Sequence, residues 1–110
     1  MIVDRNLKLI AAIIKHGKGV EVVDRLVQEK GIAECNVTSG RGRGAAHRGN
    51  YGVWDEVDTI AAIVPAERAD EIFEFIYEAG DVARPKGGIV FQHPITVSTR
   101  LDLSQETPRQ

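Results

Sequence analysis

The sequence predicts an α+β fold in which two strand–helix–strand units share one antiparallel sheet, and three observations lead to this prediction. An apolar pentapeptide occurs twice, as IAAII at 10–14 and as IAAIV at 60–64. A segment with helical periodicity follows each copy, and Gly31 or Gly80 ends that segment. A second strand candidate follows each glycine. The order strand, helix, strand is therefore repeated, which is typical of a sandwich with two helices on one face of a four-stranded sheet.

The two pentapeptides predict buried strands, because each is a short apolar run rich in β-branched residues. The other strand candidates span 33–41 and 88–91. Both alternating sets of residues in the pentapeptides are apolar, so both faces of these strands are expected to be buried. Since two helices cover only one face of a sheet, we expect the other face to pack against further copies of the chain.

The helical segments span 19–31 and 65–80, and each has an apolar stripe with charged residues outside it. We expect Pro65 in the first turn of the second helix, where its missing N–H costs nothing. Gly31 and Gly80 are predicted to end the helices as left-handed C-terminal caps. The residues predicted to face inward are Val20, Val23, Leu26 and Val27 in the first helix and Ala69, Ile72, Phe73 and Ile76 in the second.

Length and composition restrict the class of protein. We interpret 1–110 as a single domain, with a core of about 7–101 and a polar C-terminal tail at 102–110. The net charge of -2 argues against a nucleic-acid binder. A single cysteine, Cys35, excludes an internal disulfide and suits a reducing compartment. Because the sequence shows neither a signal-peptide pattern nor an apolar run of about 18 residues, we expect a cytoplasmic protein.

Two glycine-rich, basic connections are the candidates for chemistry. The first, 39–52, reads SGRGRGAAHRGNYG, and the second, 80–88, reads GDVARPKGG. Glycine allows close backbone approach, arginine offers forked donors to phosphate, and successive N–H groups in a turn can form an anion site. Neither connection has the spacing of a P-loop or of the dinucleotide motif. For the first, composition alone leaves open a solvated hairpin, an RNA-binding segment or a phosphate or nucleotide site.

Three segments resemble the PII family of nitrogen regulatory signal-transduction proteins. GIAECNVTSGRGRG at 31–44 is similar to the family's second strand, although Asn36 replaces its first threonine. HRGNYG, from His47, is similar to a patch in the family's long T-loop, and KGGIVF, from Lys86, resembles its glycine-rich B-loop. The resemblance covers about residues 7–101.

Departures from the family pattern indicate a PII-like branch with a shortened T-loop. Ala45 and Ala46 stand where family members have the glutamine that helps to hold magnesium and 2-oxoglutarate. This argues against 2-oxoglutarate as a second effector and leaves bicarbonate or another small anion open.

The resemblance implies a ferredoxin-like βαββαβ subunit in a homotrimer that binds ATP, ADP or AMP, with or without magnesium, in clefts between subunits. It also implies a regulatory target, a membrane transporter or a metabolic enzyme, that is reached through the T-loop. No nucleophile–base constellation stands out in the sequence, so we predict no catalytic residues and expect neither enzymatic activity nor a resident cofactor. Carried over by position, the nucleotide-binding residues are Ile13, Asn36, Gly42, Arg43, Gly44, Val64, Arg84, Lys86, Gly87, Gly88 and Arg100.

Arg48, Tyr51 and Trp54 are predicted to bind a partner or to be modified. Tyr51 resembles a tyrosine that some family members have nucleotidylated, although an exposed loop tyrosine also serves as a simple contact residue. Trp54 either folds back on the body of the domain or anchors a partner, since large aromatic side chains are seldom left fully exposed.

The remaining polar residues suggest no second site. The histidines lack metal-ligand spacing, so no metal site is predicted. Three acidic residues that precede the second pentapeptide are interpreted as a solvated edge, and Cys35 as a small core residue. The histidines are His16, His47 and His93, and the acidic residues are Asp55, Glu56 and Asp58.

Two other functions remain open at this point. The chain could be a trimeric protein-interaction scaffold without nucleotide binding, in which the arginine-rich connection docks an acidic partner. It could also be a trimer of the same fold that hydrolyses nucleotide slowly. Neither alternative involves nucleic acid.

Overall fold

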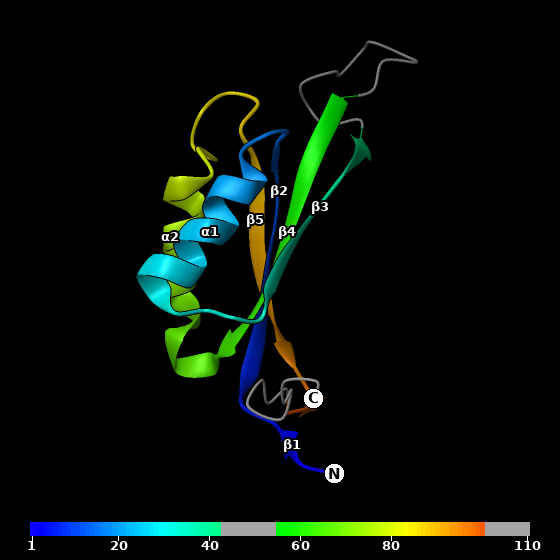
Figure 1. Ribbon diagram of the computed structural model, residues 1–110, viewed down its shortest axis with the longest axis vertical. Helices are drawn as coiled ribbons and strands as arrows, with labels where there is room; N and C mark the ends of the chain where they lie inside the picture. The colour runs from blue at the N-terminus through cyan, green and yellow to red at the C-terminus, as the bar shows by residue number, and fades with distance from the viewer. Residues whose placement is uncertain (43–54, 101–110) are drawn as a thin grey trace, which may run out of the picture.

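The computed structural model describes residues 1–42 and 55–100. Within them, strands β3, β4, β2 and β5 form one antiparallel sheet in that order, and β1 and β6 form a two-stranded ribbon. The elements in chain order are β1 (Val3–Asp4), β2 (Leu7–Lys15), α1 (Gly19–Lys30), β3 (Cys35–Gly42), β4 (Asp55–Pro65), the 3-10 helix η2 (Ala66–Arg68), α2 (Ala69–Ala79), β5 (Gly88–Ile95) and β6 (Ser98–Thr99). Both helices lie on one face of the sheet (Figure 1). The predicted ferredoxin-like βαββαβ fold is confirmed.

The central strand β2 defines the two ends of the sheet. At one end, Ile14 lies opposite Asp58 of β4 and Gly88 of β5. We call this the upper end, as it is drawn in Figure 1. At the lower end, Leu7 lies opposite Ile95, and the β1–β6 ribbon follows there. The strand order and register therefore place Gly88 and the β1–β6 ribbon at opposite ends of the sheet.

The core lies between the helices and the sheet, and the repeated pentapeptides supply its floor. Alternate residues of each repeat face the helices, because successive side chains of a strand point to opposite faces. The fully buried side chains are Ile10, Ala12 and Ile14 of β2, Ile60, Ala62 and Val64 of β4, Val22 and Leu26 of α1, and Ile72 and Ile76 of α2.

The inward stripe of α1 differs from the predicted one. Val22 and Leu26 are fully buried, whereas Val20 and Val27 are 59% and 43% exposed. The rotation of the helix is fixed at its first residue, since Gly19 is buried against the sheet and the stripe continues from it at helical spacing. For α2 the predicted stripe is confirmed, although Phe73, its fourth member, is only half-buried.

One of the two predicted helix caps is left-handed. Gly31 has φ 68° and ψ 22°, and its N–H donates to the carbonyl of Val27, as predicted. The prediction for Gly80 is wrong, because this residue has φ -85°, and the left-handed residue is Asp81, with φ 58°. Pro65 is the last residue of β4 rather than a helical residue, since its ψ of 141° is extended.

The strand β5 continues to Ile95, beyond the predicted end at Phe91. It includes Pro94, which lacks an N–H, but β5 is an edge strand paired only with β2. An edge strand tolerates proline because one side of it needs no ladder partner.

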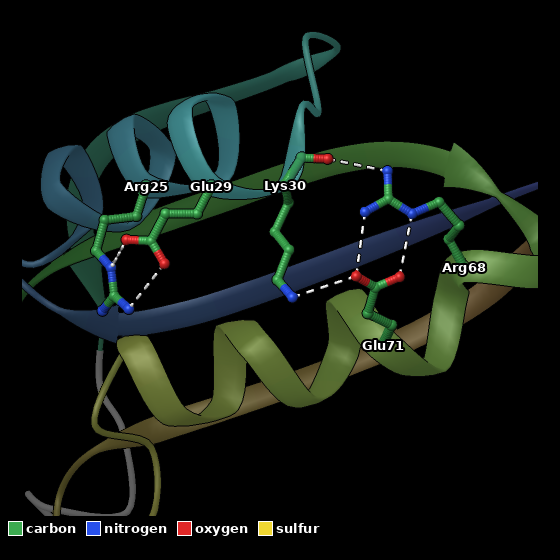
Figure 2. A network of polar contacts seen from close by, with 5 residues as sticks. All are labelled: Arg25, Glu29, Lys30, Arg68 and Glu71. Carbon is green, nitrogen blue, oxygen red and sulfur yellow. Dashed lines mark hydrogen bonds and ion pairs between the residues drawn. The ribbon is translucent and has the colours of Figure 1, made fainter.

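The helix layer is fastened by a network of charged side chains (Figure 2). The carboxylate of Glu71 accepts hydrogen bonds from Nε and Nη2 of Arg68, both at 3.1 Å, and from Nζ of Lys30 at 3.2 Å. Arg68 also donates to the carbonyl of Lys30, at the end of α1. The hydrogen bonds from Arg68 and Lys30 lower the pKa of Glu71 to about 2. The network joins the end of α1 to the start of α2.

In the part of the chain that the structure describes, no helix covers the face of the sheet opposite α1 and α2 (Figure 1). On it, Ile13, Ile89 and Phe91 are 39%, 54% and 41% exposed. The predicted apolar second face is thus confirmed, and its burial by further copies of the chain stays a prediction. No helix in the part of the chain that the structure describes has the length and apolar character needed to cross a membrane.

Candidate functional site

The predicted nucleotide-binding residues lie toward opposite ends of the sheet. Ile13, Gly42 and the segment 84–88 belong to the upper end, whereas Arg100 follows the ribbon at the lower end. Seven residues of β2 separate the ends, which corresponds to about 23 Å at the rise of a β-strand. A single chain therefore does not bring these residues into one site.

Two further predicted residues lie elsewhere on the sheet. Asn36 of β3 is paired with Ala61, near the middle, and its side chain is exposed. Val64 of β4 is paired with Lys8, and its side chain is fully buried in the helix-side core. Only the backbone of Val64 is thus available for a contact with a ligand.

Other predicted residues lie outside the described part of the chain. They are Arg43 and Gly44 of the proposed T-loop base, the partner residues Arg48, Tyr51 and Trp54, and the tail at 102–110. Their roles stay predictions.

The segment 80–88 at the upper end is a hydrogen-bonded turn. The N–H of Arg84 donates to the carbonyl of Asp81 at 3.2 Å, and the N–H of Gly87 donates to the carbonyl of Arg84 at 2.8 Å. A Cβ atom on Gly87 would overlap three carbonyl oxygens of the same turn. Gly88 has φ 116°, and a Cβ there would overlap the carbonyl of Ile13. Both glycines are therefore required by the geometry of the turn.

This turn presents two basic side chains to solvent. Arg84 is 73% exposed at its side chain, and its Nε lies 3.6 Å from Oδ2 of Asp81. Lys86 is exposed and has φ 65°. Lys18, in the turn before α1, also lies 3.6 Å from Asp81. At the upper end Lys18 and Arg84 thus both lie 3.6 Å from the carboxylate of Asp81, and the exposed Lys86 belongs to the same turn.

A buried carboxylate, Asp58, lies at the same end and is only 2% exposed. Its Oδ2 accepts hydrogen bonds from the N–H groups of Gly17 and Gly19, both at 2.9 Å. Its Oδ1 accepts one from Oγ of Ser39 at 2.9 Å and lies 2.9 Å from Nδ1 of His16. We call these contacts the Asp58 clamp. They join the turn before α1 to β3 and β4.

The clamp supplies the N-terminal cap of α1. Lys18, the N-cap residue, makes no side-chain cap hydrogen bond, and Asp58 provides it from a distance of 39 residues along the chain. Burial raises the pKa of Asp58, but the hydrogen bonds from Gly19, Ser39, Gly17 and His16 outweigh it and hold the pKa below its usual value.

The prediction of a solvated acidic edge is wrong for Asp58. Glu56 is exposed, as predicted, and nothing is described of the Asp55 side chain. The sequence did contain a signal, because Asp58 has the same strand parity as Ile60 and Ala62 and must point toward the helix layer with them.

The lower end holds a cavity of about 420 Å³ that includes Arg100. Nη2 of Arg100 lies 2.9 Å from Oδ1 of Asp4, and its Nε donates to Oδ2 at 3.3 Å. The hydrogen bond from Arg100 is the main cause of a lowered pKa of Asp4. No local pattern in the sequence indicated Asp4, because the β1–β6 ribbon brings it to Arg100 across 96 residues. The cavity is lined by Asp4, Leu7, Glu34, Ile63, Pro65, Ser98, Thr99 and Arg100.

A second hollow lies against the helix layer and contains none of the predicted residues. It measures about 530 Å³ and is lined by Asp70, Phe73, Glu74, Tyr77, Glu78 and Gln92. Its three carboxylates make it unsuited to a phosphate.

Cys35 packs against the core, as predicted. Its Sγ lies 3.5 Å from the carbonyl of Ile32, and burial raises the pKa of the thiol. Within residues 1–42 and 55–100, no three side chains of the metal-binding types form a group that could hold an ion.

Comparison with known proteins identifies the family. The model of the nitrogen regulatory protein P-II family matches residues 7–103. A crystal structure of Arabidopsis thaliana PII bound to citrate matches with a TM-score of 0.67, at 18% identity, over 84% of this chain and 80% of that chain. At this identity the structural match shows a shared fold. The comparison with curated proteins found no match.

The chain therefore belongs to the nitrogen regulatory protein P-II family. It is a signal-transduction regulator of the PII type, and the resemblance on which its predicted binding residues were based is confirmed.

Proposed function

We propose that this PII-family chain forms a homotrimer, binds an adenine nucleotide in clefts between subunits and controls a membrane transporter or a metabolic enzyme through its T-loop. The observation that carries this proposal is the turn at 80–88, which holds Arg84 and Lys86 exposed on a backbone fixed by Gly87 and Gly88. A turn whose backbone has one conformation presents both cationic side chains from the same place, and both can bind phosphate.

The open face of the sheet supports assembly into a trimer. Its exposed apolar side chains need a partner surface, and a second copy of the chain supplies one. Association also explains why the predicted binding residues lie at opposite ends of one chain. The upper end of one copy would meet the lower end of another, so that Arg84 and Lys86 face the Arg100 of a neighbouring subunit.

The ligand that fits these residues is ATP, ADP or AMP, with or without magnesium. Arg84, Lys86 and Arg100 would bind the phosphates, and the exposed apolar side chain of Ile13 would form part of the wall beside the base. The Arabidopsis PII of the same fold is described as bound to citrate, an anion, which supports anion binding by this architecture. A second small anion, such as bicarbonate, could bind the exposed cations Arg84 and Lys86 at the upper end.

A screen of ligand-induced stabilisation tests the nucleotide site. The purified protein is heated with ATP, ADP, AMP and cyclic AMP, with and without magnesium, 2-oxoglutarate and bicarbonate, and hits are measured by calorimetry. A ligand that binds only the folded state adds about 2.7 kcal/mol of stability at a hundredfold excess over its Kd. The double variant Arg84→Ala/Lys86→Ala should lose most of the nucleotide-dependent rise in Tm.

A matched control is Arg25→Ala/Lys30→Ala, which removes the same charge from α1, and each rise in Tm is taken from the variant's own starting value. Equal loss in both double variants would contradict a specific site at 80–88. The absence of any nucleotide effect would favour the trimeric scaffold instead. Release of phosphate from ATP in the same samples would favour slow hydrolysis over pure regulation.

A further inference from the structure

The ion pair between Asp4 and Arg100 is a forked contact at the edge of a cavity. Both carboxylate oxygens of Asp4 are engaged, one by Nη2 and the other by Nε of Arg100. The backbone holds the pair in place, since β1 pairs Asp4 with Ser98 of β6 and the N–H of Arg100 donates to the carbonyl of Ile2. This is the geometry in which arginine also binds phosphate.

The pair is accessible to solvent. The side chain of Arg100 is 52% exposed and that of Asp4 is 31% exposed. Pairs exposed to this degree are held by modest free energies, because water screens the attraction and competes for both groups. An anion that enters the 420 Å³ cavity can therefore take the place of the Asp4 carboxylate.

The charges of the cavity oppose an anion that binds beside the intact ion pair. Asp4 and Glu34 give the lining two carboxylates against one guanidinium, so an anion that left the Asp4–Arg100 contact intact would meet a net negative surface. A phosphate that binds the Nε–Nη2 edge of Arg100 therefore has to replace Asp4 there.

We propose that Asp4 is an internal competitor for the phosphate group that Arg100 binds, and that it thereby sets the affinity of the chain for phosphate-bearing ligands. The assignment of that phosphate to an adenine nucleotide rests on the proposed function. The competition itself does not, because any phosphate that binds the Nε–Nη2 edge of Arg100 has to displace the same carboxylate.

The test is calorimetric titration of pyrophosphate, ADP and adenosine into the wild type and four variants. Asp4→Asn should tighten binding of pyrophosphate and ADP by about two- to fivefold, the range that exposed ion pairs span. Adenosine, which carries no phosphate, should show no change. Glu34→Gln is the matched control, since it removes the same charge from the same cavity and leaves the two hydrogen bonds accepted by Asp4.

Two further variants connect the effect to Arg100. Arg100→Gln should weaken binding of pyrophosphate and ADP, and the double variant Asp4→Asn/Arg100→Gln should show no gain over it. The Tm of every variant without ligand is recorded, so that a loss of folding is not mistaken for a loss of binding.

The outcomes separate the competition from the proposed function. A gain for pyrophosphate in Asp4→Asn without any binding of ADP would support the competition and contradict the nucleotide function. Equal binding of ADP by the wild type and Asp4→Asn would support the nucleotide function and contradict the competition. The competition is also overturned if Asp4→Asn weakens binding, if Glu34→Gln gains as much, or if neither anion binds any variant.

Discussion

Asp58 at the upper end of the sheet and Asp4 at the lower end differ in burial and in the number of their contacts. At the upper end, Asp58 is 2% exposed and makes four contacts that join the turn before α1 and the first residue of α1 to β3 and β4. At the lower end, the side chain of Asp4 is 31% exposed and is hydrogen-bonded by a single arginine. The first holds the turn before α1 against β3 and β4, and the second is placed to exchange with a ligand.

The difference follows from burial and from the number of partners. When a buried carboxylate is removed, the backbone N–H groups that donated to it find no acceptor in water or protein. Its removal is therefore costly. An exposed carboxylate is replaced by water when it leaves. Burial, and not the type of residue, decides which aspartate is structural.

Asp58→Ala should have the largest effect on stability. It removes four contacts at once and leaves the buried N–H of Gly19 without an acceptor, so we expect a loss of about 3 kcal/mol. The measurement is urea unfolding at a fixed protein concentration, because association shifts the midpoint. Glu56→Gln, an exposed neighbour on β4, is the control and should change little. Similar losses from Asp58→Ala and Asp4→Ala would break the contrast between the two ends.

Gly88→Ala should cause the second largest loss of stability. It tests whether the backbone of the 80–88 turn at the upper end is rigid. The new Cβ would overlap the carbonyl of Ile13, and φ 116° is unfavourable for alanine. We expect a loss of about 2 kcal/mol or more, again by urea unfolding. Gly40→Ala is the matched control in β3, since a Cβ there meets no atom within 4 Å. An equally stable Gly88→Ala would show that the turn can rearrange.

The smallest change in stability should come from lowering the pH. The folded pKa of Asp58 lies below its unfolded value of about 3.9, so its contribution is complete above that pH and is lost as the pH falls through the folded pKa. The stability gap between wild type and Asp58→Asn should therefore narrow below about pH 4. Asp4 has the same sign, but its exposure makes the narrowing for Asp4→Asn smaller. A gap for Asp58→Asn that stays constant down to pH 2 would contradict the lowered pKa.

The sequence predicted the fold through its local patterns, and the errors show where such patterns end. The repeated pentapeptide and Gly31 were interpreted correctly, since strand alternation and a left-handed cap depend on neighbouring residues alone. Val20 was predicted to begin the inward stripe of α1, but Gly19 begins it and Val20 is exposed. The burial of Gly19 against the sheet fixes the rotation of that helix. Gly80 was predicted as a left-handed cap, but Asp81 has that conformation instead.

The candidate site was predicted between subunits, and a single chain shows only where each part of it lies. Arg84, Lys86, Gly87 and Gly88 do form one turn at the upper end, as their spacing in the chain requires. No local pattern indicated that Arg100 would lie at the other end, because that depends on the direction of β5 and on its register with β2.

The sequence by itself determined the α+β class, the strand–helix–strand repeat, the two apolar faces and the membership of the P-II family, because each is encoded in short-range periodicity or in contiguous motifs. Only the tertiary structure decided which carboxylates are buried and which cations they hold. Asp58 reaches Gly19 across 39 residues and Asp4 reaches Arg100 across 96. Contacts between residues so far apart in the chain depend on strand pairing and helix packing, which no single stretch of sequence specifies.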